Sequence, residues 1–147
     1  MNKELSKILS DKLRVFVTDT TKRCADKVKF CRYSGTTIGK DAEIGCFVGL
    51  FFSPEDRVKL DDYFCGKSSS VSDIVWGYRD LEDKFPVVVP SIIMENSSVF
   101  REFQSIHDTD FFWTTNGLTI EGKLKLTSTI RFNNLDISDF EFALNND

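Results

Sequence analysis

Apolar residues near the start of the chain recur at intervals of three and four, the spacing that places side chains on one face of an α-helix. The residues on this face are Leu5, Ile8, Leu9, Leu13 and Phe16. The pattern predicts an amphipathic helix from about Lys3 to the region 18–21, where polar β-branched residues weaken helix formation. We interpret it as a helix that packs on the core, in preference to one that lies on a membrane or on a partner.

A small β element is expected in the next part of the chain. Residues 29–33 have the composition of a short strand, which ends at Ser34 and Gly35. After a turn at residues 39–41, residues 42–47 form either the matching strand of a hairpin or a short helix. The pattern therefore favours a two-stranded element here, with helices on both sides of it.

A clear helix start lies at Ser53 and Pro54. Serine caps the first turn of a helix with its side chain, and proline suits the first helical position because its missing N–H is not needed there. Two acidic residues follow, and they favour the positive end of the helix dipole. We expect this helix to stop at Gly66.

The middle of the chain is punctuated by loops. Residues 67–70 are polar, and Ser72 and Asp73 then predict the start of a short helix. Residues 80–90 contain an apolar run between two prolines. Because each proline fixes its own φ and disfavours helix before it, we expect a connector segment there.

The last third of the chain predicts three helices. The first follows Asn96 and is succeeded by a loop over residues 109–117. Residues 119–132 form the second, although residues 123–127 also alternate as a strand does, so helix and strand both stay open. A short helix over residues 136–144 ends the chain. Together these elements predict one α+β domain over residues 1–147, mainly α, with a small two-stranded β element.

Fourteen phenylalanines are an unusual number for 147 residues. Phenylalanine buries a large apolar area and has no polar group, so it indicates a core or a protein-binding surface more than an active site. The pairs Phe51-Phe52 and Phe111-Phe112 cannot place both rings on one helical face. We therefore expect some of these rings to be exposed, which favours a partner-binding patch.

Charge and hydropathy exclude several classes of function. The net charge is −4, and the lysines are interrupted by acidic residues, so no basic stripe for nucleic acid is present. No run reaches the ~18 to 20 apolar residues of a membrane span. The first nine residues lack the apolar segment of a signal peptide. We expect a cytoplasmic protein that binds neither nucleic acid nor membrane, with its four cysteines reduced.

The candidate catalytic residues are Cys46, His107 and Asp108. His107 is the only histidine, and Cys46 lies between two glycines, Gly45 and Gly49. If a helix starts near Cys46, its N-terminus would stabilise the thiolate. In this hypothesis His107 is the base, and Asp108 or another polar group orients its ring. Asp108 is a poor orienter, because neighbouring residues of a helix point in different directions. The alternative is a structural histidine bonded to a backbone carbonyl.

A metal site is a weaker hypothesis. The dipeptide of His107 and Asp108 also occurs in metal-dependent phosphohydrolases, but those need further histidines, which this chain lacks. Cys31, Cys46 and His107 could hold zinc only as a non-contiguous set, since no two cysteines have the close spacing of a zinc knuckle. The sequence therefore assigns no metal and no cofactor, and a small zinc-stabilised domain stays an alternative.

Three words stand in order along the chain: Cys-Arg-Tyr-Ser-Gly at 31–35, Ile-Gly-Cys-Phe-Val-Gly-Leu at 44–50 and Phe-Gln-Ser-Ile-His-Asp at 103–108. They resemble a family of small uncharacterised bacteriophage and prophage proteins, with Cys-x-Tyr-x-Gly, Cys-Ala-Ile-Gly-like and Leu-Gln-x-x-His-Asp-like words. This chain departs from the family in an insertion-like stretch at 68–90 and in Phe103, where the family prefers leucine.

The resemblance implies a viral origin and action in the host cytoplasm, and it supplies no activity or site. Small phage accessory proteins often bind a host protein and inhibit or redirect it. The leading hypothesis is therefore a phage-type accessory protein that binds a host or phage protein through a surface rich in phenylalanine. A thiol enzyme that uses Cys46 and His107 is the main alternative.

Overall fold

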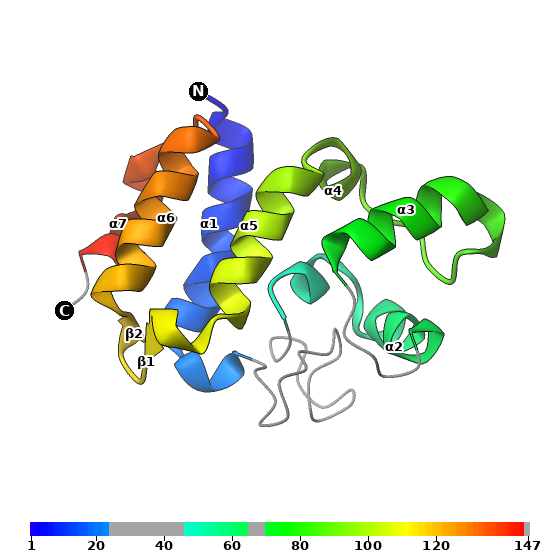
Figure 1. Ribbon diagram of the computed structural model, residues 1–147, viewed down its shortest axis with the longest axis horizontal. Coiled ribbons are helices and arrows are strands. Elements are labelled where there is room, and N and C mark those ends of the chain that lie inside the picture. The colour runs from blue at the N-terminus through cyan, green and yellow to red at the C-terminus, as the bar shows by residue number, and fades with distance from the viewer. Residues whose placement is uncertain (24–45, 65–69, 146–147) are drawn as a thin grey trace.

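Three helices of twelve or more residues form one side of the molecule: α1 (Lys3–Thr18), α5 (Ser97–Asp108) and α6 (Ile120–Phe132). The computed structural model describes residues 1–23, 46–64 and 70–145. In Figure 1, α6 lies on the outside of this group, and α5 is the member nearest to the other half of the molecule. That half contains α2 (Pro54–Tyr63) and α3 (Val71–Leu81).

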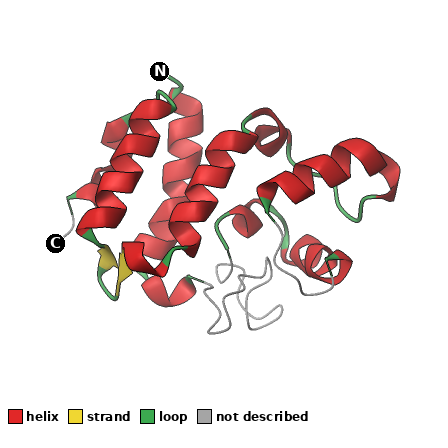
Figure 2. Cartoon of the chain, in the orientation of Figure 1, coloured by secondary structure: helices red, strands yellow, loops and turns green. Residues whose placement is uncertain are grey.

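Shorter elements connect these helices. Two are α-helical: α4 (Ser91–Glu95) and α7 (Glu141–Leu144). The 3₁₀ turns are η1 (Thr20–Lys22), η2 (Val48–Phe51), η3 (Glu82–Lys84), η4 (Asp110–Phe112) and η5 (Ile137–Phe140). The predicted first helix and the two helices near the end of the chain are therefore present, whereas α4 was not predicted. Figure 2 shows how strongly helix dominates the described parts of the chain.

The helix starts follow local capping chemistry. Ser53 Oγ accepts a hydrogen bond from the N–H of Asp56 at 3.2 Å, and Pro54 is the first residue of α2, as the sequence predicts. At α3 the predicted cap at Ser72 or Asp73 is wrong, because the cap lies two positions before Ser72. Ser70 caps this helix by accepting from the N–H of Asp73, while the Asp73 carboxylate accepts from the N–H of Ser70. This reciprocal pair is a capping box, and it needs the residue three positions before the acid.

The helix over residues 119–132 is confirmed, and its alternation does not produce a strand. Thr119 Oγ1 accepts from the N–H of Gly122 at 3.1 Å and so caps α6. At the other end, Asn134 has a φ of 55°, and the N–H of Leu135 donates to the carbonyl of Ile130 at 2.9 Å. A left-handed residue followed by this long-reaching bond is a common helix stop.

The two-stranded sheet lies in a different place from the expected one. Strands β1 (Trp113–Thr114) and β2 (Gly117–Leu118) are antiparallel, and Trp113 pairs with Leu118. The sequence predicted a loop here, because two residues per strand are too few to show an alternating pattern. The strand expected at 29–33 and residues 42–45 of its expected partner lie outside the described residues.

Aromatic side chains form much of the core. Fully buried rings come from Phe16, Phe47, Phe100, Phe103 and Phe140. The ring of Phe103 lies 5.3 Å from that of Phe47 and 5.8 Å from that of Phe140, so α5 contacts core residues from the η2 segment and from the last part of the chain. The predicted fold class is confirmed: a single domain, mainly α, with a small two-stranded β element. Among the described helices, none is long and apolar enough to cross a membrane.

Candidate functional site

His107 lies in the last turn of α5 with its side chain fully buried. Its Nδ1 is 2.9 Å from Oδ1 of Asp108. A carboxylate only accepts hydrogen bonds, so the ring donates from Nδ1 in this contact. The expectation that Asp108 is a poor orienter is therefore wrong. Asp108 is the last residue of α5, so its side chain is not confined to the outside of a continuing helix and can turn toward the ring.

The far side of the histidine ring faces the core. The ring of Phe16 lies edge-on, with 4.7 Å between the two centroids. Within the described ranges, His107 Nε2 is buried and has no hydrogen-bond partner, Cys46 Sγ included. The alternative hypothesis, a structural histidine bonded to a backbone carbonyl, is also wrong about the partner. The His107 ring bonds the carboxylate of Asp108.

Cys46 lies two residues before η2, with its side chain 1% exposed. Its Sγ accepts a hydrogen bond from the N–H of Gly49 at 3.3 Å. The helical turn that begins just after Cys46 is a four-residue 3₁₀ turn, not the α-helix start on which the thiolate hypothesis depended. The thiol is enclosed by the core, so a substrate in solvent does not reach it in this conformation.

Gln104 connects the segment after Cys46 with Asp108, and the sequence analysis gave it no role. Its Oε1 accepts from the N–H of Val48 at 2.9 Å, and its Nε2 donates to Asp108 Oδ1 at 2.8 Å. The structure thus brings His107 and Asp108 into direct contact, and Gln104 links Asp108 to the segment that holds Cys46. The Cys46–His107 pair required for a thiol nucleophile is not hydrogen-bonded.

Arg23 completes the polar groups at this end of α5. Its guanidinium donates to the carbonyl of His107 at 2.7 Å and pairs with Asp110. The ring of Trp113 lies 5.5 Å from the guanidinium, and its indole N–H donates to the carbonyl of Ile106 at 2.8 Å. These donors satisfy carbonyls that a helix end leaves without partners. No local sequence signal could reveal Arg23, since 84 positions separate it from His107.

The described residues contain no group of three or more histidine, cysteine or acidic side chains that could hold a metal ion. Three of the four cysteines, Cys24, Cys31 and Cys65, lie outside the residues that the structure describes, and Cys31 belongs to the zinc set considered above. The described residues therefore give no support to the zinc hypothesis, and its predicted ligand set stays untested.

The most unusual surface belongs to α6. We define the α6 outer face by its six exposed residues: Ile120, Glu121, Leu124, Ser128, Arg131 and Phe132. Three of them are large and apolar, and they are exposed by 74% at Ile120, 66% at Leu124 and 84% at Phe132. The opposite side of the same helix is buried in the core. A helix with apolar residues on both sides is typical of one that is covered on both sides.

The described phenylalanines fall into two groups, one in the core and one on the surface. Most described phenylalanines are buried or half-buried, and they explain the high count as core. Phe111 and Phe132 are the exposed ones among the described residues, at 66% and 84%. The expectation that some rings of the pairs would be exposed is confirmed for Phe111, whereas Phe51 is half-buried and Phe52 is buried. Other exposed aromatic side chains lie at Trp76 in α3 and Tyr63 in α2.

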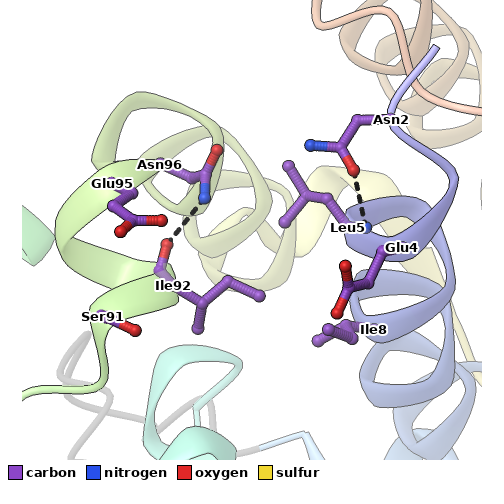
Figure 3. A pocket seen from close by; sticks show the side chains of 8 residues that line it. All are labelled: Asn2, Glu4, Leu5, Ile8, Ser91, Ile92, Glu95 and Asn96. Atoms are coloured by element: carbon purple, nitrogen blue, oxygen red, sulfur yellow. Dashed lines mark hydrogen bonds between the residues drawn. The ribbon is translucent and has the colours of Figure 1, made fainter.

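A shallow hollow lies between the start of α1 and α4 (Figure 3). Glu4 and Glu95 stand on its two sides, with Leu5, Ile8 and Ile92 between them. Its volume is about 250 Å³, just below the ~300 to 1,000 Å³ of typical ligand pockets. The α6 outer face is therefore the stronger candidate for function.

Comparison of the chain with protein-family models, with curated proteins and with solved structures found no match.

Proposed function

We propose that this chain is a phage-type accessory protein, acting in the host cytoplasm, that binds a host or phage protein through the α6 outer face and so inhibits or redirects it. The observation that carries the proposal is the exposure of Ile120, Leu124 and Phe132 on the outside of a helix whose inside already packs on the core. Large exposed apolar patches on a folded domain are typical of interaction sites. The phage assignment itself rests on the resemblance of the three sequence words.

The free energy gained by covering the three apolar side chains is suited to weak, reversible binding. Covering a large apolar side chain contributes about 1.5 to 3 kcal/mol, so the three residues together contribute several kcal/mol. Association costs roughly 4 to 15 kcal/mol before any contact is counted. The apolar residues alone therefore support only weak binding, and polar contacts must add to them. Glu121 and Arg131, exposed on the same face, can supply such contacts.

Burial argues against the thiol enzyme as the first choice. Cys46 and His107 are 1% and 0% exposed, and within the described chain no hydrogen bond joins them. A nucleophile and its base need to lie within hydrogen-bond reach and to be open to substrate. By contrast, the α6 outer face is accessible without any movement of the fold.

The test is site-specific photo-crosslinking followed by binding with the purified partner. A photo-reactive phenylalanine analogue at position 124 should crosslink one protein in the bacterial host cell, which mass spectrometry identifies. Calorimetry with that purified protein should then show Leu124→Glu weakening binding by about tenfold or more, since a charge replaces a central apolar contact. Val88→Glu is the matched control, because Val88 is also exposed, by 75%, but lies outside α6. Equal loss in both variants, or none in either, contradicts the proposal.

A further inference from the structure

We propose that Asn116 is a site of spontaneous deamidation, in which its side-chain amide becomes a carboxylate, and that the hydroxyl of Thr114 limits the rate. Asn116 lies at the tip of the β1–β2 hairpin and is exposed. It precedes Gly117 in the only Asn-Gly dipeptide of the chain. The site is separate from the α6 outer face, so neither proposal depends on the other.

The reaction uses only the chain and water. The main-chain nitrogen of Gly117 attacks the side-chain carbonyl carbon of Asn116, and the new C–N bond closes a five-membered imide ring. The C–N bond of the side-chain amide breaks, and its nitrogen leaves as ammonia with the proton of the Gly117 N–H. Water then opens the ring at either carbonyl. The product is aspartate or isoaspartate, in which the main chain runs through the former side-chain carbonyl.

The residue after the asparagine and the shortness of the hairpin both favour this reaction. Asparagine is a thermolabile residue, and Gly117 has no side chain to hinder the approach of its own nitrogen. The hairpin has only two residue pairs, Trp113 with Leu118 and Thr114 with Gly117. So short a pairing is marginal by itself. The pair next to the loop can therefore open without unfolding of the domain.

The Thr114 side chain holds the loop closed. Its Oγ1 accepts a hydrogen bond from the N–H of Asn116 at 3.1 Å and donates to the carbonyl of Gly117 at 3.2 Å. These bonds fix the main chain on both sides of the bond that must rotate to bring the Gly117 nitrogen to the Asn116 side chain. The Thr114 hydroxyl is therefore a positioning group that slows the reaction in the folded protein.

The reaction alters the contacts of the hairpin with the rest of the fold. The carbonyl of Thr115 accepts from Thr20 Oγ1 at 3.1 Å, which joins the loop to η1. Isoaspartate adds one main-chain carbon to this loop, so the pairing of Thr114 with Gly117 and the contact with Thr20 cannot both keep their geometry. Strand β2 also leads directly to Thr119, the cap of α6. The modified protein should therefore unfold at a lower urea concentration than the unmodified protein.

Peptide mapping by mass spectrometry tests the site, after incubation of the purified chain for weeks in mildly alkaline buffer at physiological temperature. In wild type the peptide that holds Asn116 should gain the mass of an exchange of NH₂ for OH. Asn96 should stay an amide, because Ser97 follows it and its Nδ2 donates to the carbonyl of Ile92 at 3.0 Å. Asn116→Gln should not convert at this position, since glutamine would have to close a larger ring. Wild type that keeps the amide at 116, or converts Asn96 as fast, overturns the proposal.

Thr114→Val tests the role of the hydroxyl, because it keeps the shape of the side chain. It should speed conversion of the native protein by about threefold or more, the effect of losing hydrogen bonds of ordinary strength. In urea, which removes the hairpin, wild type and Thr114→Val should convert at equal rates, and both should convert faster than native wild type. Equal rates in the native proteins, or a difference that persists in urea, overturn the role of the hydroxyl.

Two further measurements complete the test. Circular dichroism should show that Thr114→Val keeps the fold, since Thr114 is exposed. Urea unfolding should show a lower midpoint for incubated wild type than for Asn116→Gln incubated in the same way. Equal midpoints with Asn116 fully converted would contradict the expected loss of stability.

Discussion

The guanidinium of Arg23 donates a hydrogen bond to the main-chain carbonyl of His107 at 2.7 Å. It joins the segment after α1 to the last turn of α5, whose carbonyls lack partners within the helix. The Arg23 side chain is only 12% exposed, so its hydrogen bonds are largely protected from water. This contact therefore contributes more to the stability of the fold than an exposed ion pair would.

Arg23→Ala should lower the free energy of unfolding by about 1.5 to 3 kcal/mol, the range for a hydrogen bond to a charged group. Urea unfolding followed by circular dichroism measures it. Arg79→Ala is the matched control, because Arg79 is exposed in the last turn of α3 and should change stability by less than about 0.5 kcal/mol. Equal losses in the two variants would mean that the Arg23 contacts contribute nothing particular.

Local signals in the sequence account for much of the fold. Ser53 and Pro54 start α2, and Thr119 starts α6, because a cap depends only on residues three positions away. The sequence also finds the core face of α1, since burial of Leu5, Leu9 and Leu13 follows the 3.6-residue period.

What the sequence misses depends on contacts between distant residues. The guanidinium of Arg23 bonds residues 84 and 87 positions away, and the β1–β2 hairpin is too short to show a pattern. The same holds for the candidate site. His107 could be singled out as the lone histidine, but its burial against Phe16 could not. The exposure of Leu124 was equally hidden, because an apolar residue in a helix is normally expected to face the core.

Gly122 lies where α6 approaches η4 so closely that there is no room for a side chain. A β-carbon at this position would lie 2.4 Å from the main-chain oxygen of Phe112 and 3.1 Å from Leu118. Gly122→Ala should therefore destabilise the fold by about 1 to 3 kcal/mol through overpacking, although alanine is the better helix former by about 1 kcal/mol.

Ser128→Ala in the same helix is the control for Gly122→Ala. Ser128 is exposed, so the change should shift stability by less than about 0.5 kcal/mol. Urea midpoints of both variants decide the matter. A Gly122→Ala protein as stable as wild type would show that η4 can move away from α6 at little cost.

Asp136 should give the fold a specific dependence on acid. The hydroxyl of Ser138 and then the Ser138 N–H donate to its carboxylate, which lowers the pKa of Asp136 below its ordinary value of 3.8. A lowered pKa in the folded state means stability that is present above pH 3.8 and is lost as the pH falls through the lowered pKa.

Thermal unfolding of Asp136→Asn and wild type should therefore differ at pH 6, and the difference should shrink below pH 3.8. Glu141→Gln is the control, because Glu141 is an exposed acid in the neighbouring helix α7. A gap between wild type and Asp136→Asn that stays constant from pH 6 to about pH 2.5 would assign the effect of the substitution to something other than the charge.

The reactivity of the Cys46 thiol distinguishes a buried core thiol from the nucleophile of a thiol enzyme. Because its side chain is 1% exposed, its reaction with a disulfide reagent should require opening of the fold. In a variant with Cys24, Cys31 and Cys65 replaced by serine, native protein should react at least about a hundredfold more slowly than protein in urea. The rate should rise in parallel with each destabilising substitution, Gly122→Ala included, and should not change with His107→Asn beyond that variant's effect on stability. Fast native reaction that is lost in His107→Asn at unchanged stability would instead show that the histidine activates an accessible thiol.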